Sequence, residues 1–197
     1  MNIQPDKPMS HGAPVRSDEA RWAAVVARDA ADATIRFASG QCSLGSILAA
    51  TSGKGICAIL LGDASAALLD DLYRRFPRSV IGAGDAELER LLAKVISFVE
   101  APSSGLDWPL DLKGTAFQRR VWQALRDTAA GATVSYADLA RRIGSPKAVR
   151  AVARACAGNH IAVAIPCHRV IRGDGALSGY GWGVARKRAL LAREALR

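Results

Sequence analysis

The stretch IAVAIPCHRV, residues 161–170, places a cysteine and a histidine side by side directly after an apolar run. The run is typical of a short buried strand, and Pro166 predicts its end because proline cannot donate to a sheet ladder. Cys167 is therefore expected at a strand end, where a reactive group is held rigidly and can still be reached by substrate. Arg169 and Arg172 follow, and nearby positive charge favours the nucleophilic thiolate.

The cysteine also has an ordinary structural explanation, because cysteine is among the residue types most often found in cores. Cys57 and Cys156 lie among Ile, Ala and Leu and are expected in the core, whereas Cys42 lies in a Gly/Ser-rich turn. None forms a C-x-x-C pair, so the sequence predicts no metal site. Only Cys167 has a histidine and basic residues beside it, which favours a reactive role.

The formal net charge of +9 is unevenly distributed along the 197 residues. Residues 110–197 contain 16 Lys and Arg against 5 Asp and Glu, whereas residues 1–109 contain 11 against 13. A C-terminal half with such an excess of basic residues is typical of nucleic-acid binding, although a basic surface that is merely solvated would show the same excess. No apolar stretch reaches the roughly 18 residues that span a bilayer, and the N-terminus lacks the apolar core of a signal peptide. We therefore expect a cytoplasmic protein that is not bound to membranes.

The pattern along the chain predicts a tail and two domains of an α/β (α+β) protein. Residues 1–32 are expected to be a flexible tail with a helical stretch. Residues 33–105 predict a small α/β domain, with an antiparallel meander of strands near 34–38, 46–50 and 55–61 and helices near 64–76 and 85–99. Residues 106–197 predict a helical domain, with helices near 116–125, 136–143 and 147–157.

The last two helices are joined by Gly144-Ser145-Pro146, which is typical of a helix-turn-helix. In the second helix only Lys147, Arg150 and Arg154 have long side chains. A helix with such small side chains favours close approach to a DNA backbone and insertion of one arginine, as in shape-based or minor-groove binding. A core helix with three solvated basic residues is the alternative.

With these motifs in order, the chain resembles the O6-alkylguanine-DNA alkyltransferases, and most closely the alkyltransferase domain of bacterial Ada proteins. The resemblance runs from about residue 33 to 197. It rests on the segments GICAILLG (55–62), GTAFQ (114–118), VSY (134–136), PKAVRAV (146–152) and the run from Ile165 to Tyr180. Residues 18–29 also resemble the opening of the Ada regulatory domain, but the four-cysteine zinc site that should follow is absent.

The resemblance implies a DNA-repair protein that moves an alkyl group irreversibly from the O6 atom of guanine to its own cysteine, once per molecule. The partner would be double-stranded DNA, bound by a monomer through the minor groove without a cofactor, with O4-alkylthymine as a further candidate substrate. The implied fold is a ribonuclease H-like sheet with helices, followed by a winged-helix-like domain that contains the helix-turn-helix.

The resemblance also implies catalytic roles for four residues. Cys167 matches the alkyl acceptor, and His168 matches the base that activates it through a water molecule. Glu194 matches the acid that orients His168, and Asn159 matches the residue that braces the turn around the site. Such a set makes chemical sense, because a thiol with a pKa of about 8.5 is mostly protonated at neutral pH and needs an oriented base.

For DNA, Arg150 matches the arginine that fills the gap left by the flipped base. Tyr136 matches the tyrosine that crowds the neighbouring phosphate. The expected DNA-binding residues are Tyr136, Lys147, Arg150, Ala151 and Arg154. The expected substrate pocket consists of Tyr136, Val170, Tyr180, Gly181 and Trp182. Because some relatives carry glycine in place of Trp182, we expect a tight pocket that handles methyl better than benzyl groups.

Two other functions are open from the sequence. A helix-turn-helix module could recognise alkylated DNA without chemistry, but non-reactive relatives replace the acceptor cysteine, which is present here. A cysteine hydrolase could use Cys167 and His168, but adjacent residues of a strand point to opposite faces.

Overall fold

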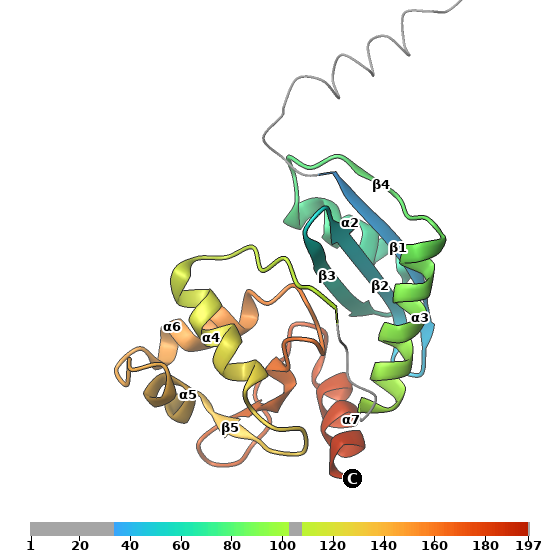
Figure 1. The fold of residues 1–197 in the computed structure, drawn as a ribbon. Coiled ribbons are helices and arrows are strands. Elements are labelled where there is room, and N and C mark those ends of the chain that lie inside the picture. The colour runs from blue at the N-terminus through green and yellow to red at the C-terminus, as the bar shows by residue number, and fades with distance from the viewer. Residues whose placement is uncertain (1–33, 103–107, 197) are drawn as a thin grey trace, which may run out of the picture. The chain divides into compact units, whose positions relative to one another are not determined.

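The computed structural model of the chain describes residues 34–102 and 108–196, and Figure 1 shows the order of its helices and strands. The elements are β1 (Ile35–Cys42), β2 (Gly45–Ser52), β3 (Gly55–Gly62), α2 (Ser65–Arg75), β4 (Ile81–Ala83), α3 (Ala86–Glu100), α4 (Ala116–Arg126), β5 (Val134–Ser135), α5 (Tyr136–Arg142), α6 (Val149–Ala157), the 3-10 helix η2 (Cys167–Arg169), β6 (Val170–Ile171) and α7 (Val184–Ala195). Residues Ala33–Arg197 group as one compact unit. The expected tail and the boundary between residues 105 and 106 lie outside the described residues.

The sheet has the strand order β3-β2-β1-β4, and β1, β2 and β3 form the predicted antiparallel meander. The short strand β4 pairs parallel to β1, so the expectation of a purely antiparallel sheet is wrong at this edge. Three residues are too few for hydrophobic periodicity to reveal a strand. Helices α2 and α3 pack against the sheet. They end before Pro77 and Pro102, as the sequence predicts.

The outer edge of β3 is covered by two segments from the second half of the chain. Ile56 pairs with the segment 109–111, and Ile59 pairs with the segment 160–162, through backbone hydrogen bonds of 2.8–2.9 Å. An uncovered strand edge would offer its backbone groups to other chains. The pairing therefore protects the edge and joins the sheet to the helical half.

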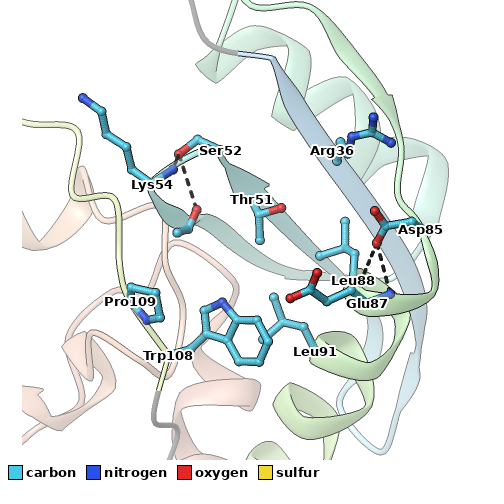
Figure 2. A pocket seen from close by; sticks show the side chains of 12 residues that line it. Arg36, Thr51, Ser52, Lys54, Asp85, Glu87, Leu88, Leu91, Trp108 and Pro109 are labelled. Carbon is cyan, nitrogen blue, oxygen red and sulfur yellow. Dashed lines mark hydrogen bonds between the residues drawn. The ribbon is translucent and has the colours of Figure 1, made fainter.

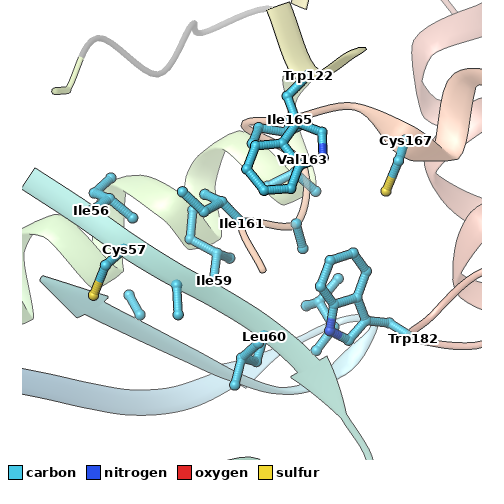
Figure 3. Packing of buried hydrophobic residues seen from close by; sticks show 14 of the residues in the cluster. Ile56, Cys57, Ile59, Leu60, Trp122, Ile161, Val163, Ile165, Cys167 and Trp182 are labelled. Atoms are coloured by element: carbon cyan, nitrogen blue, oxygen red, sulfur yellow. The ribbon is translucent and has the colours of Figure 1, made fainter. Parts of the chain in front are cut away.

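One hydrophobic core runs through both halves of this unit. Figure 3 shows Ile59 and Leu60 of β3 in the same buried cluster as Trp122, Ile161 and Trp182. The Trp122 indole is 2% exposed and donates its Nε1 hydrogen to the carbonyl of Ala155 in α6 (2.8 Å). Helix α6 is thus fixed to the core through α4.

The predicted helices of the second half are present, and their caps explain where they begin. Thr115 and Gln118 form a capping box at the start of α4, and the Ser135 hydroxyl accepts from the Asp138 amide at the start of α5. Helix α6 begins at Val149, two residues later than expected, since residues 146–147 form a turn. Within the two described ranges, no helix is long and apolar enough to cross a membrane.

Replacing Gly55 with alanine is expected to destabilise the junction between the halves. Gly55 has φ +138°, and a β-carbon there would lie 2.3 Å from the Pro109 carbonyl oxygen. We expect the free energy of unfolding to fall by about 1–3 kcal/mol, measured by chemical denaturation. Gly53→Ala is the matched control because a β-carbon at Gly53 meets no atom within 4 Å. Equal stability of the two variants would contradict the prediction.

Candidate active site

The loop before Cys167 is not the strand that its apolar residues predict. Only Ile161 forms a bridge, to Ile59 of β3, and the chain then turns sharply. The Ala164 amide donates to the Ala162 carbonyl (2.6 Å) around Val163, whose φ of 60° is rare for a β-branched residue. Residues 161–165 are apolar because they are buried in a loop. A short apolar run of this kind cannot be identified as a strand from periodicity alone.

A second tight turn delivers the cysteine. The Cys167 amide donates to the Ile165 carbonyl (2.8 Å) around Pro166, whose φ of −80° and ψ of 59° are those of an inverse γ-turn. Cys167 therefore begins the 3-10 helix η2 rather than ending a strand. Cys167 and His168 therefore do not point to opposite faces of a strand.

Asn159 holds this loop from within. Its side-chain Nδ2 donates to the Ile165 carbonyl (2.9 Å) and to Cys167 Sγ (3.2 Å), and its Oδ1 accepts from the Ile161 amide (2.9 Å). Asn159 is buried, so these contacts are shielded from solvent. One side chain thus fixes both ends of the loop and the sulfur itself.

His168, Arg169 and Glu194 form a buried cluster where η2 meets α7. His168 Nε2 lies 2.9 Å from Glu194 Oε1, and Arg169 Nη2 donates to the same oxygen (2.7 Å). The second carboxylate oxygen accepts from Arg169 Nε (3.0 Å) and from the Gly131 amide (3.1 Å). Arg169 also donates to the Thr128 carbonyl. The carboxylate is therefore fully hydrogen-bonded although it is out of contact with solvent.

The electrostatics of this cluster decide which nitrogen of His168 carries the proton. Burial alone would raise the pKa of Glu194, but the hydrogen bonds from His168 and Arg169 lower it to about 2. Burial lowers the pKa of His168, against the opposing effect of Glu194, so the imidazole is neutral at neutral pH. An ionised carboxylate can only accept, so Nε2 carries the hydrogen and Nδ1 keeps its lone pair. Nδ1 is buried and has no hydrogen-bond partner among the described residues.

The expectation that Arg169 and Arg172 favour a Cys167 thiolate is wrong. Arg169 is bound to Glu194, and Arg172 lies on the surface beside Asp174 (3.1 Å). Burial raises the pKa of the Cys167 thiol to about 11, while the Asn159 hydrogen bond and the Lys187 charge act in the opposite direction. The resting cysteine is therefore a thiol that needs a base.

Cys167 opens onto a cavity of about 320 Å³. The cavity is lined by Tyr136, Ala153, Cys156, Ala157, Cys167, Gly179, Tyr180 and Gly181. It thus brings together residues from α5, α6, η2 and the loop before α7. The Tyr136 hydroxyl lies 2.8 Å from Ser178 Oγ, and the Tyr180 ring lies edge-on to His168 at 6.4 Å. The Tyr180 hydroxyl is buried without a hydrogen-bond partner among the described residues.

Two expected pocket residues do not line the cavity. Val170 is buried in β6, and Trp182 packs edge-on against Tyr180 with ring centroids 5.2 Å apart. Figure 3 shows the Trp182 indole in the buried cluster near Leu60. Trp182 therefore does not narrow this cavity, and the expected preference for methyl over benzyl groups has no support from its position.

Four of the five expected DNA-binding residues lie on α6 or just before it, whereas Tyr136 begins α5 and is half-buried. Lys147, Arg150, Ala151 and Arg154 are all exposed, and Arg150 and Arg154 are one helical turn apart. The buried side of α6 carries Val152, Ala155 and Cys156, which exposes a face of small and basic side chains. Cys156, expected in the core, is buried and also lines the cavity. Ser178 and Lys187, which are joined to the Tyr136 hydroxyl by hydrogen bonds, belong to no sequence motif that would mark them.

A second, larger cavity of about 530 Å³ lies at the β2–β3 turn and the start of α3 (Figure 2). It contains both signs of charge, from Arg36 and Lys54 and from Asp85 and Glu87, together with the Trp108 ring. No cysteine or histidine lines it, so it has no nucleophile comparable with Cys167. In the described ranges, no cluster of three or more His, Cys, Asp or Glu could hold a metal ion.

The fold and site together define a protein with a buried cysteine that is followed by a buried His–Arg–Glu cluster and lies beside a helix-turn-helix. Known proteins that are similar to the chain in sequence and structure agree with this description. The family model for "6-O-methylguanine DNA methyltransferase, DNA binding domain" matches residues 116–196. The chain is 53% identical over 161 residues to the bifunctional transcriptional activator/DNA repair enzyme Ada of Escherichia coli, which covers 82% of this chain and 46% of that protein.

Two further relatives are matched over most of their length. The chain is 41% identical over 129 residues to a methylated-DNA–protein-cysteine methyltransferase of Kluyveromyces lactis, which covers 62% of this chain and 67% of the relative. A crystal structure of Mycobacterium tuberculosis OGT in complex with DNA is similar with a TM-score of 0.69 and 33% identity, over 82% of this chain and 93% of that one. The chain belongs to the methylated-DNA–protein-cysteine methyltransferase family. It spans slightly less than half the length of the Ada protein.

Glu194→Gln is expected to destabilise the protein in a pH-dependent way. At about pH 7 the free energy of unfolding should fall by about 3–5 kcal/mol, because Arg169 is left as an uncompensated buried charge. The pKa of Glu194 is about 2 in the folded protein and about 4.3 in an unfolded chain. Its stabilisation is therefore complete above about pH 4.3 and is lost as the pH falls toward about 2.

Urea denaturation across this pH range measures the effect, and the stabilities of wild type and Glu194→Gln should converge as the pH falls. Glu89→Gln, which removes an exposed carboxylate from α3, is the control and should follow wild type. A constant difference between wild type and Glu194→Gln at every pH would contradict the prediction.

Proposed function

We propose that this protein repairs DNA by accepting an alkyl group from O6-alkylguanine onto Cys167. The observation that carries the proposal is the position of Cys167. Its sulfur opens onto a cavity bordered by two tyrosines and accepts a hydrogen bond from Asn159. In the sequence, Cys167 follows a helix-turn-helix whose exposed face is basic. Relatives of the chain that are methylated-DNA–protein-cysteine methyltransferases support the same substrate class.

The chemistry follows from the cluster around His168. The free Nδ1 lone pair would take the thiol proton through a water molecule, while Glu194 holds the ring in the required tautomer. The thiolate attacks the alkyl carbon in line, a carbon–sulfur bond forms, and the carbon–oxygen bond breaks with its electron pair going to guanine O6. The guanine anion then takes up a proton, which balances the proton that the thiol gave to His168. The product is a thioether that water does not hydrolyse, so each molecule reacts once.

The target oxygen lies within a duplex, so the base must leave the stack, at a cost of a few kcal/mol. We propose that Arg150 enters the gap and that Tyr136 faces the adjoining phosphate, with Lys147, Ala151 and Arg154 contacting the backbone. The small exposed side chains of α6 support close approach through the minor groove. The cavity bordered by Tyr136, Tyr180 and Gly181 would receive the flipped base.

Several finer features belong to the same proposal. They are a ribonuclease H-like first half, a winged-helix-like second half, and action as a cytoplasmic monomer without a cofactor. Repair of O4-alkylthymine is a further candidate activity at the same cysteine. Support for these features comes from the family resemblance.

Intact mass after incubation with duplex DNA containing one O6-methylguanine tests the function. We expect one gain of about 14 Da on Cys167, because a methyl group replaces the thiol hydrogen. Cys167→Ser should gain nothing, and Cys57→Ser, which alters a core cysteine away from the cavity, should behave as wild type. DNA binding without any mass gain would instead favour a lesion-binding module, and turnover of an ester would favour a hydrolase.

Arg150→Ala tests base flipping separately from chemistry. With duplex substrate we expect the transfer rate to fall by about tenfold to a hundredfold. The variant loses the arginine side chain that would stabilise the DNA with its base flipped out, by about 1.4–2.8 kcal/mol. With free O6-methylguanine the rate should equal that of wild type, because no base has to be flipped. Arg90→Ala removes an exposed arginine from α3 and serves as the control. An equal loss with both substrates would contradict the role of Arg150.

A further inference from the structure

A third cavity, of about 190 Å³, borders the loop that leads to Cys167. We call it the loop cavity, and it is lined by Phe98, Arg126, Val163, Ala164, Pro166 and Arg169. None of these six residues lines the cavity onto which Cys167 opens. The loop cavity is therefore separate from the proposed pocket for the flipped base.

The charge of the loop cavity is of one sign. Its two charged residues are Arg126, on α4, and Arg169, in η2, and the other four are apolar. Among the described residues, no acidic side chain lines it, whereas the larger cavity at α3 carries both signs of charge. Asp127, next to Arg126, instead accepts a hydrogen bond from Gln123 (2.9 Å). The loop cavity therefore favours a negatively charged occupant.

Arg169 has hydrogen-bond donors that the protein leaves unused. A guanidinium carries five N–H hydrogens, one on Nε and two on each terminal nitrogen. The Nε hydrogen of Arg169 is shared between the two oxygens of Glu194, and Nη2 donates one hydrogen to Glu194 Oε1. Nη1 donates one hydrogen to the Thr128 carbonyl. Among the described residues, the second hydrogen on Nη1 and the second on Nη2 have no acceptor.

Unused donors are unusual here, because Arg169 is only 7% exposed. Buried polar groups nearly always have a hydrogen-bond partner, so an unused pair points to a water molecule or an ion. Glu194 neutralises Arg169, but the Arg126 guanidinium forms no ion pair or hydrogen bond with any described residue. A second, unpaired positive charge at the same wall favours an anion over water.

The backbone of the loop offers a further donor. Val163 is buried in the wall of the loop cavity, and among the described residues its amide has no acceptor. Backbone amides in turn conformations form concavities that bind anions, and guanidinium groups bind oxyanions through charge-assisted hydrogen bonds. The cavity thus combines two kinds of group that recognise oxyanions.

We propose that the loop cavity is a binding site for a small oxyanion such as inorganic phosphate, held between Arg126 and Arg169. The oxyanion accepts the unused hydrogens of Arg169 and pairs with the charge of Arg126. It shares Arg169 with Glu194, so one guanidinium has negative charge on two sides. The bound oxyanion also joins α4 to the loop that positions Cys167. Binding requires neither DNA nor alkyl transfer.

Titration with inorganic phosphate at about pH 7.5, followed by nuclear magnetic resonance, tests the proposal. With ionic strength held constant by sodium chloride, we expect the Val163 amide and the Arg169 Nε–H resonances to shift and then to saturate. In Arg126→Gln the apparent dissociation constant should rise by about tenfold, because one charge-assisted hydrogen bond is lost. Arg120→Gln removes an exposed arginine of α4 that does not line the cavity, and should bind as wild type.

Three outcomes would overturn the proposal. Shifts that grow without saturating would show that phosphate acts only through the solvent. Equal dissociation constants in wild type and Arg126→Gln would show that Arg126 takes no part. Saturable shifts confined to α6 would place the oxyanion on the helix expected to bind DNA, and not in the loop cavity.

Urea denaturation gives a second readout that does not depend on assigned resonances. A ligand that binds only the folded state stabilises it, and phosphate also stabilises folded proteins in general because it is excluded from their surface. The quantity to compare is therefore the rise in the denaturation midpoint that phosphate causes in each protein. We expect a smaller rise in Arg126→Gln than in wild type and Arg120→Gln, and equal rises would contradict the site. Since neither readout uses DNA, a negative result leaves the proposed repair function untouched.

Discussion

The candidate active site depends on the buried carboxylate of Glu194. It accepts hydrogen bonds from His168, Arg169 and the Gly131 amide, and so joins α7 to η2 and to the loop before β5. Its low pKa keeps it ionised, and an ionised carboxylate fixes the histidine tautomer. The arginine is equally necessary, because a lone buried carboxylate would become protonated. The same three side chains therefore support the structure and, in the proposed function, would also activate the cysteine.

Much of the fold was predictable because local signals agreed with the tertiary structure. The meander follows from short β-rich runs between Gly/Ser turns, and α4 and α5 begin at the expected caps, Thr115 and Ser135. The loop over residues 161–165 was not predictable from periodicity. Its side chains are apolar because the loop is buried, whereas its backbone conformation depends on the hydrogen bonds of Asn159 and on the turn at Val163. The strand β4 was too short to carry a pattern.

The site was predictable in its residues and less so in its electrostatics. The family resemblance named Cys167, His168, Asn159 and Glu194, which the structure brings together, and their roles in transfer stay predictions. Sequence proximity suggested that Arg169 acts on the sulfur, but the guanidinium points to Glu194 instead. Lys187 lies 20 positions from Cys167 in a helix rich in basic residues, so nothing in the sequence distinguishes it from a solvated lysine.

The contacts that hold α7 also bear on how the chain folds. Arg186 donates to the Leu44 carbonyl (2.7 Å) and Arg193 donates to the Val99 carbonyl (2.7 Å), across 142 and 94 positions of sequence. Closing loops of that length costs entropy before any contact repays it, and chains rich in such contacts fold slowly. The sheet, built from neighbouring hairpins, can form early. The reactive centre, which needs α7 docked, is then among the last parts of the molecule to be assembled.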